Sequence, residues 1–414
     1  MCKGGLIMTQ VNVAWRTQTI PIRAEDQLAY LLVTVKADAV SARAPLNLCL
    51  ALDRSPSMRQ ELPALKQAAL HVVEALSDGD ILSIVAYDGG TQILLPATRI
   101  DARSRSRAQV SIKMLDEGND TFVSNGLGGG MQELRKHHGQ GVVSRLVLLA
   151  DGQTNGDQHR CLSIAQEFGS LGIPIFGFGL GAEWESELFT ELGKLSGGSC
   201  EYLKDGSAIK MGFLDAVKLS QGIVARNAML SLELSPGLRL RRVGKVQPAI
   251  EDEVLTAVST ISVPLGDLST TLPTAVLFEV MLPYQPAGTY LAGRLHLSST
   301  LSSGHPESVS ADVVVTYADR PSHDVVPEVA NIVERVTAHR LRTSAVQDLA
   351  AGEVGRATMK LRNAATRLLD LGELELGQQT HQLALDVERR GGVDAAGQLA
   401  LKHGTRKLTG RLEL

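Results

Sequence analysis

Residues 49–58 read Cys49-Leu50-Ala51-Leu52-Asp53-Arg54-Ser55-Pro56-Ser57-Met58, an apolar run that ends in one carboxylate and two hydroxyls spaced two residues apart. The run begins at Leu46 and resembles a strand that a parallel sheet buries on both faces. The carboxyl end of such a strand is the usual ligand crevice of an open α/β sheet. We therefore expect the oxygens of Asp53, Ser55 and Ser57 to converge at this edge.

Two later segments add oxygen ligands to the same edge. The loop Gly118–Ser124 leads into a helical pattern and offers the hydroxyl of Thr121. A second buried-strand pattern, Leu146–Gly152, ends in Asp151. Ligand sets made only of oxygen suit a hard divalent cation, and Mg²⁺ in particular. The sequence therefore predicts a Mg²⁺ site, with Mn²⁺ or Ca²⁺ as alternative cations.

The three parts together, Asp53-x-Ser55-x-Ser57, Thr121 and Asp151-Gly152, resemble the metal-ion-dependent adhesion site of the von Willebrand factor type A (VWA) family. The resemblance covers roughly residues 45 to 205 and implies a doubly wound, Rossmann-like α/β domain. It also implies that both serines ligate the metal directly, that the threonine does so in the ligand-bound state, and that the two aspartates act mostly through water. The sixth ligand would be an acidic residue of a partner protein.

The resemblance further implies a biological setting. Similar intracellular bacterial proteins act as non-enzymatic adaptors for large assemblies, often beside ATPases of the AAA+ class. One departure from the family pattern is Pro56, where the family usually carries glycine. Because proline fixes φ and removes an N–H, we expect a stiffer loop with altered ligand selectivity but unaltered metal binding.

Simpler interpretations exist for each part of the pattern. Ser55 or Ser57 could cap a helix that begins near Gln60, and Thr121 could cap the next one. Asp151-Gly152 is also an ordinary turn signal. Each interpretation is plausible alone, but together they require several independent coincidences, so the metal site is favoured.

Composition narrows the function further. The 414 residues predict two to three domains, and 44% hydrophobic with 21% charged residues is typical of a globular protein with a sizeable core. A net charge of −4 without a long basic run argues against a nucleic-acid partner. No apolar stretch is long enough to span a bilayer. The four cysteines show neither zinc nor disulfide spacing, so we expect a cytoplasmic protein.

Hydrophobic periodicity predicts four segments along the chain. They are the N-terminal strands of a β-sandwich (8–44), the VWA domain (45–205), a connecting helix with the rest of the sandwich (206–322), and a C-terminal helical domain (323–414). In the VWA domain, strand patterns alternate with helical ones, as in a doubly wound sheet. The flanking segments alternate apolar and polar residues, as half-buried antiparallel strands do. The predicted fold is thus an α/β domain inserted in an antiparallel sandwich, followed by a helical bundle.

The expected elements have these bounds. Strands of the α/β domain cover Leu46–Leu52, Ile81–Tyr87, Gln92–Leu95, Leu146–Leu149 and Ile173–Gly179. Its helices cover Leu62–Leu76, Ala102–Leu115, Ser124–Lys136, Asp157–Leu171 and Glu183–Leu195. The sandwich has two strands before the insert, Val11–Ile22 and Leu28–Ala37, and six after it, Met229–Leu234, Leu238–Val243, Val254–Val263, Ala275–Leu282, Thr289–Ser298 and Ser308–Tyr317. Ala208–Arg226 is the connecting helix. The tail has a helix marked by apolar residues from 329 to 346, then Met359–Leu371, Leu376–Val387 and Ala395–Leu408.

We find no catalytic constellation in the sequence. Gly128-Gly129-Gly130 lacks the lysine and hydroxyl of a phosphate-binding loop and more plausibly permits close packing of a helix on the sheet. Two other functions stay open. One is a metal-dependent hydrolase or transferase, with Asp120 or His159 as base. The other is a structural scaffold that binds through its helical tail, which is also a surface for homo-oligomer formation.

Overall fold

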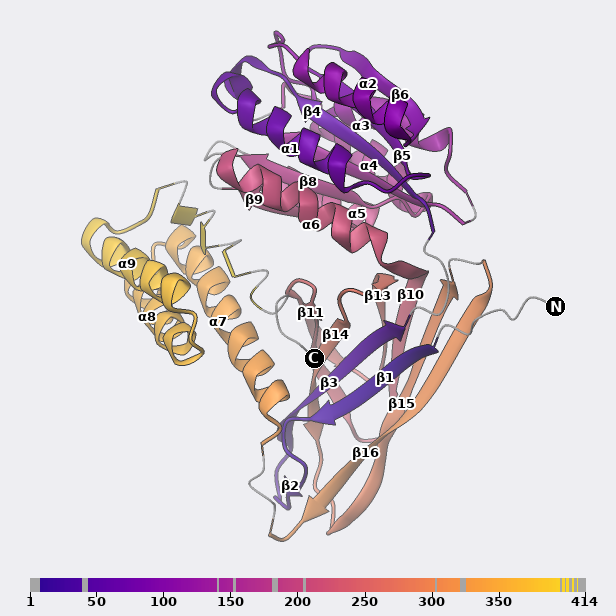
Figure 1. The fold of residues 1–414 in the computed structure, drawn as a ribbon. Helices are drawn as coiled ribbons and strands as arrows, with labels where there is room; N and C mark the ends of the chain where they lie inside the picture. The colour runs from indigo at the N-terminus through magenta and orange to yellow at the C-terminus, as the bar shows by residue number, and fades with distance from the viewer. Residues whose placement is uncertain are drawn as a thin grey trace, which may run out of the picture. The chain divides into compact units, whose positions relative to one another are not determined.

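The computed structural model describes residues 8–38, 44–139, 141–151, 154–180, 185–203, 206–301, 304–320 and 325–394, with 397–398, 400–401, 404–405 and 408. The described residues form two compact units. One comprises residues 44–223. The other combines 8–38 with 224–301 and the described residues from 305 onward. The chain thus leaves the second unit to build the first and then returns to it (Figure 1).

The α/β unit is built on a six-stranded sheet in the order β6-β5-β4-β7-β8-β9. Only β6 runs antiparallel to its neighbour. The strands are β4 (Leu46–Asp53), β5 (Ile81–Tyr87), β6 (Thr91–Arg99), β7 (Val143–Ala150), β8 (Ile175–Leu180) and β9 (Ser199–Leu203). Every residue of β4, β5 and β7 is buried, which explains why their sequences are mostly apolar. The buried polar exceptions include Asn47 and Arg145.

Helices cover both faces of this sheet (Figure 1). They are α1 (Leu62–Ala75), α2 (Ala102–Lys113), α3 (Val123–Arg135), α4 (Gln158–Ser170), α5 (Ser186–Ser196) and α6 (Ile209–Gln221). Helices α1, α2 and α6 share one core with Leu48 and Leu50, whereas α3 packs on Cys49 and Leu146 from the other face. The doubly wound architecture expected from the alternating pattern is confirmed.

Two expectations for this unit are corrected. The short edge strand β9 was not predicted. The helix expected over Ala208–Arg226 ends at Gln221, and strand β10 begins at Ile223. This helix is part of the α/β unit rather than a connection, because the ring of Phe213 lies 5.5 Å from that of Phe178 in β8. The expected start of α5 at Glu183 lies outside the described residues.

The sandwich consists of two five-stranded sheets. The first has the order β1-β3-β14-β11-β12: β1 (Met8–Trp15), β3 (Gln27–Asp38), β14 (Thr274–Leu282), β11 (Arg239–Gln247) and β12 (Glu251–Val258). The second has the order β13-β10-β15-β16-β2: β13 (Thr260–Ser269), β10 (Ile223–Leu234), β15 (Gly288–Leu301), β16 (Pro306–Ala318) and β2 (Ile20–Pro21). Leu31 and Val33 of β3 meet Leu230 and Leu295 of the other sheet in a common core.

The sandwich departs from the expected strands in three ways. The single strand predicted over Val11–Ile22 is divided into β1 and β2, which lie in different sheets. The strand predicted over Val254–Val263 breaks at Ser259, where the chain passes from one sheet to the other. The short strand β2 also pairs with β16 in parallel, so the sandwich is not purely antiparallel.

Three helices follow the sandwich: α7 (Pro327–Ala350), α8 (Val354–Asp370) and α9 (Leu374–Arg390). Val329 and Ile332 of α7 pack with Leu32, Ala275 and Leu277 on the outer face of the first sheet. That sheet is therefore covered on both faces, which explains why β14 is buried almost throughout. The fourth helix expected over Ala395–Leu408 falls largely outside the described residues.

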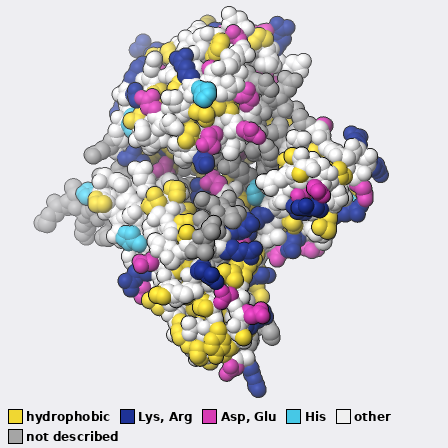
Figure 2. Space-filling model, turned by 180° about the vertical axis from the view of Figure 1, so that it is seen from behind, with side chains coloured by type: hydrophobic (Ala, Val, Ile, Leu, Met, Phe, Trp, Pro, Cys, Tyr) yellow, Lys and Arg dark blue, Asp and Glu magenta, His cyan; other side chains and the backbone are white. Residues whose placement is uncertain are grey.

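The second sheet of the sandwich keeps an open face. Leu291 and Val314 lie opposite each other on β15 and β16 and are 48% and 53% exposed. Hydrophobic side chains are gathered on the part of the sandwich at the bottom of Figure 2.

Among the described residues, no helix combines the length and the apolar character needed to cross a membrane.

Candidate metal centre

Adjacent strand ends bring the two predicted aspartates to one edge of the α/β sheet. Asp53 is the last residue of β4, Asp151 directly follows β7, and these strands are neighbouring and parallel. The Ser55 N–H donates to Asp53 Oδ1 (2.8 Å), and the Ser57 hydroxyl donates to Asp151 Oδ1 (2.7 Å). The two serine hydroxyls are 3.0 Å apart. One hydrogen-bonded chain thus joins Asp53, Ser55, Ser57 and Asp151.

Helix capping does not account for these hydroxyls. A 3₁₀ turn covers Pro56–Gln60, and Ser55 is its N-cap residue, yet no side-chain cap bond is formed. The N-cap residues of α1 and α3 are Glu61 and Phe122, and neither cap is made by a side chain. Pro56 lies in the first turn, where its missing N–H removes no helical hydrogen bond. The serine side chains therefore remain available to a ligand.

Asp53 is a fully buried carboxylate with one unpaired oxygen. Its side chain is 0% exposed, and Oδ2 has no hydrogen-bond partner. The hydroxyl of Tyr87 donates to the carbonyl oxygen of Leu149 (2.7 Å). Burial raises the pKa of Asp53 to about 7; the bonds from Ser55 lower it, and the charge of Asp151 raises it. A divalent cation beside Asp53 would offset the cost of burying this charge.

Thr121, the fifth predicted residue, lies in the loop before α3. Its N–H donates to Asp120 Oδ1 (2.9 Å), and its carbonyl oxygen accepts from the N–H of Asn155 (2.9 Å). Its hydroxyl is not part of the hydrogen-bonded chain that joins the other four predicted residues. The structure therefore gathers four of the five side chains and ties the loop of the fifth to the loop that follows Asp151.

The residues that make this tie were not predicted from the sequence. The hydroxyl of Thr154 accepts from the N–H of Val123 (3.0 Å), and Asp157 Oδ2 accepts from the N–H of Ser124 (2.9 Å). The Thr154 hydroxyl also donates to Asp157 Oδ1, and the Asn155 amide donates to Asp120. The available signal was Thr-Asn-Gly-Asp at 154–157, a turn sequence closely following a predicted ligand.

Glycines let α3 approach the sheet beneath the site. A Cβ at Gly130 would lie 2.5 Å from Leu146 Cδ1, and one at Gly129 would lie 2.6 Å from a methyl carbon of Thr91. The expected close packing is confirmed for these two glycines. It is wrong for Gly128, where a Cβ would meet nothing within 4 Å. Gly126 packs in the same way on the ring of Tyr87, at 2.5 Å.

The donor set fits a small hard cation. Its atoms are hydroxyl and carboxylate oxygens, the ligands that Mg²⁺ prefers. Two oxygens at about 2.1 Å from one octahedral Mg²⁺ lie about 3.0 Å apart when adjacent. The spacing of 3.0 Å between the hydroxyls of Ser55 and Ser57 agrees with two adjacent ligands of such an ion. Among the described residues there is no group of three or more His, Cys, Asp or Glu side chains arranged to hold a metal.

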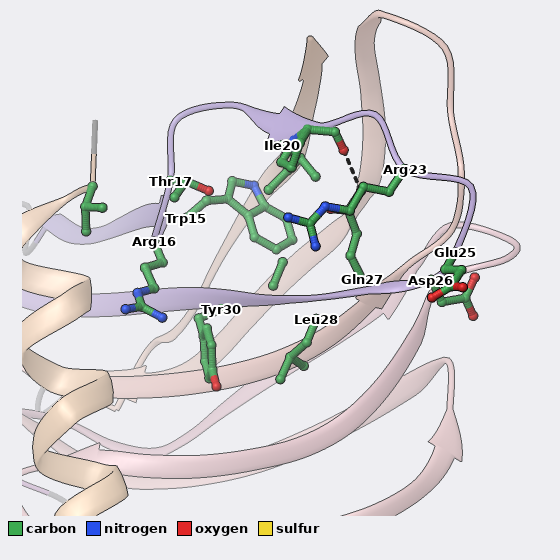
Figure 3. A pocket seen from close by; sticks show the side chains of 13 residues that line it. Trp15, Arg16, Thr17, Ile20, Arg23, Glu25, Asp26, Gln27, Leu28 and Tyr30 are labelled. Atoms are coloured by element: carbon green, nitrogen blue, oxygen red, sulfur yellow. Dashed lines mark hydrogen bonds between the residues drawn. The ribbon is translucent and has the colours of Figure 1, made fainter. Parts of the chain in front are cut away.

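A second concave region lies in the sandwich, where β1, β2 and β3 line a hollow of about 620 Å³ (Figure 3). Several of its polar groups are already paired. Trp15 Nε1 donates to the carbonyl oxygen of Val314 (2.7 Å), and Gln27 Nε2 donates to that of Pro21 (2.6 Å). The guanidinium of Arg16 lies 5.7 Å from the ring centre of Tyr30. These contacts serve packing, so the edge with Asp53 is the stronger candidate site.

Comparisons with known sequences agree with this geometry. The family description "von Willebrand factor type A domain" matches residues 47–210, and "Sll0103-like, C-terminal alpha-helical domain" matches 327–411. The uncharacterized protein sll0103 of Synechocystis is 29% identical over 346 residues, which are 81% of each chain. The uncharacterized protein YfbK of Escherichia coli is 24% identical over 67% of this chain, a match that spans 49% of YfbK.

Solved structures share the fold. A von Willebrand factor type A protein from Catenulispora acidiphila aligns over 98% of both chains with a TM-score of 0.75 and 17% identity. The ArnB paralog VWA2 from Sulfolobus acidocaldarius aligns over 98% of this chain and 99% of its own, with a TM-score of 0.56 and 17% identity. Domains of the VWA family often depend on a divalent metal and mediate protein interactions. The chain therefore contains a VWA domain, inserted in a β-sandwich and followed by a Sll0103-like helical domain.

Proposed function

We propose that this protein is a non-enzymatic adaptor that captures a partner protein through a divalent metal, Mg²⁺ in the first place. Ser55, Ser57 and Thr121 would hold the metal directly, and Asp53 and Asp151 would act beside it, mostly through water. The bound metal would supply a Lewis-acidic position for a carboxylate of the partner.

The observation that carries this proposal is the state of Asp53. Its Oδ2 is buried without a hydrogen bond, while the neighbouring hydroxyls of Ser55 and Ser57 face each other and cap no helix. Buried carboxylates are normally paired or coordinate a metal. The combination supports a cation site better than it supports a structural turn.

The ligand class follows from charge. Two or three neutral hydroxyls compensate little of a 2+ charge, so the site would favour an anionic ligand, and an Asp or Glu of a partner protein supplies one. We place this activity in the bacterial cytoplasm, within an assembly linked to an AAA+ ATPase. Self-association through α7–α9 belongs to the same proposal. Nucleic acid and membranes are not proposed as partners.

The test compares the intact chain with its Ser55→Ala variant. Calorimetric titration with Mn²⁺ and pull-downs with and without EDTA should show metal binding and metal-dependent partner capture, both lost in the variant. Ser106→Ala is the matched control, because Ser106 is an exposed α2 residue whose hydroxyl bonds only its own helix, to the carbonyl oxygen of Ala102. Capture that persists unchanged in EDTA would refute the proposal.

A further inference from the structure

We propose that Thr154, Asn155 and Asp157 form a loop clamp that positions Thr121 by fixing its loop to the start of α4. This inference rests on the proposed function, in which Thr121 and Asp151 serve the same metal. Thr154 and Asp157 are positioning residues here: they contact the loop of a ligand, and the proposal gives them no contact with the metal.

The loop clamp joins two segments far apart in the sequence. Backbone N–H groups of residues 123 and 124 donate to Thr154 Oγ1 (3.0 Å) and Asp157 Oδ2 (2.9 Å). The carbonyl oxygen of Thr121 accepts from the Asn155 N–H (2.9 Å). The Asn155 amide also bonds Asp120, next to Thr121. Every residue from 120 to 124 except Phe122 is thus bonded to the segment 154–157.

The loop clamp contains a buried hydroxyl and a carboxylate at the start of a helix. Thr154 is 5% exposed, and its hydroxyl both accepts from Val123 and donates to Asp157 Oδ1. Asp157 is the residue before α4, and its carboxylate reaches the first turn of α3, where N–H groups lack helical partners. A carboxylate bound there is also favoured by the helix dipole. Two helices and two ligand loops are therefore joined at one point.

Coupling is the expected result. Thr121 has no hydrogen bond to the serines or to Asp151 among the described contacts. On the serine side its loop is held by the N–H of Gly118, which donates to the carbonyl oxygen of Arg54 (2.6 Å), and on the side of α4 it is held by the loop clamp. A shift of the segment 154–157 would carry Thr121 with it. Removal of a residue that only orients a metal ligand commonly lowers the metal affinity by about 10- to 100-fold.

The first test needs no metal. Hydrogen exchange of the intact chain in EDTA is compared for wild type, Thr154→Val, which removes the hydroxyl at nearly constant shape, and Thr154→Ser, which keeps it. The valine variant should lose protection at the amides of Val123 and Asn155 together, and the serine variant should retain it. Loss of protection at Val123 with Asn155 unchanged would refute the loop clamp.

The second test is a double-mutant cycle read by Mn²⁺ affinity. Thr154→Val should weaken Mn²⁺ binding about 10- to 100-fold, whereas Thr154→Ser should bind Mn²⁺ like wild type. The double variant Thr121→Ala with Thr154→Val should bind Mn²⁺ no more weakly than Thr121→Ala alone. Thr98→Val, in β6, is the matched control. Additive effects of the two substitutions would overturn the positioning role. If wild type binds no Mn²⁺, the proposed function fails, and the exchange result alone decides whether the clamp exists.

Discussion

Each of the two units contains a buried carboxylate, and the two carboxylates differ in whether a basic side chain pairs with them. The side chain of Glu279 in β14 is 4% exposed. Its carboxylate accepts a hydrogen bond from the guanidinium of Arg340 in α7, and Arg242 Nε lies 4.0 Å from Glu279 Oε2. Asp53 is fully buried, and among the described residues no basic side chain pairs with it. Its neighbour Arg54 pairs with Asp88 instead, at 2.9 Å.

The difference supports the proposal that Asp53 receives its balancing cation from outside the chain. A buried charge is tolerated when an opposite charge and hydrogen bonds compensate it. The sandwich unit supplies arginines to Glu279, so that site is complete as folded. The α/β unit surrounds Asp53 with hydroxyls and a second acid, Asp151, and in the proposed function a metal supplies the balancing charge.

The largest effect is expected from Asp53→Asn, measured as the free energy of unfolding in EDTA. Folding raises the pKa of Asp53 from 3.8 to about 7, so the folded state binds the proton more tightly. Wild type is therefore penalised above pH 7 by up to about 4 kcal/mol, and this penalty disappears as the pH falls from 7 to 4. The Asp53→Asn variant should be more stable than wild type at pH 8 and similar at pH 4.

Adding Mg²⁺ should reverse that order at pH 8, because wild type alone gains stability from the bound metal. The gain should fade as the pH drops through about 7, where Asp53 becomes protonated. A wild-type advantage at pH 8 in EDTA would contradict the view that Asp53 lacks a balancing charge.

A somewhat smaller effect is expected at the complete site. Arg340→Ala leaves Glu279 buried beside the more distant Arg242 and should lower the free energy of unfolding by about 3 kcal/mol. Arg239→Ala is the matched control, because its pair with Asp26 is exposed and is worth less than about 1 kcal/mol. Denaturant titrations should show the same losses with and without Mg²⁺. If Mg²⁺ restored the stability of Arg340→Ala, the proposed difference between the Glu279 and Asp53 sites would be contradicted.

The smallest effect is expected from alanine substitutions in α3, which test the packing of this helix on the sheet near Asp53. A methyl group at Gly126 would lie 2.5 Å from the buried ring of Tyr87, so Gly126→Ala should destabilise by about 2 kcal/mol and weaken Mn²⁺ binding. Gly128→Ala, two residues away in open space, should instead stabilise α3 by up to about 1 kcal/mol. Equal effects of the two alanines in thermal unfolding would show that helix propensity alone decides.

The sequence predicts the α/β unit well because its central strands are buried on both faces and are therefore mostly apolar. The order of the strand ends then brings Asp53 and Asp151 together. The edge strand β9 escaped prediction because it is short and only Cys200 and Leu203 are buried. The helix α6 was extended too far because Ile223 and Val224 continue its apolar pattern into β10.

Other features depend on partners that a local pattern does not reveal. The break at Ser259 and the parallel pairing of β2 with β16 depend on which sheet each strand joins. The covering of the first sheet by α7 is likewise a long-range contact. The bonds from Thr154 and Asp157 to α3 were missed for the same reason, since their partners lie 31 and 33 residues away.

The pairing of β3 with β14 has a consequence for how the protein is made. Roughly 230 residues separate Asp38 from Thr274, and the whole α/β unit lies between them. At a synthesis rate of about 5–20 residues per second, β3 waits about 10–50 seconds on the ribosome for its partner. The VWA domain is complete in that interval, so connectivity alone makes the sandwich close after the VWA domain that is inserted in it.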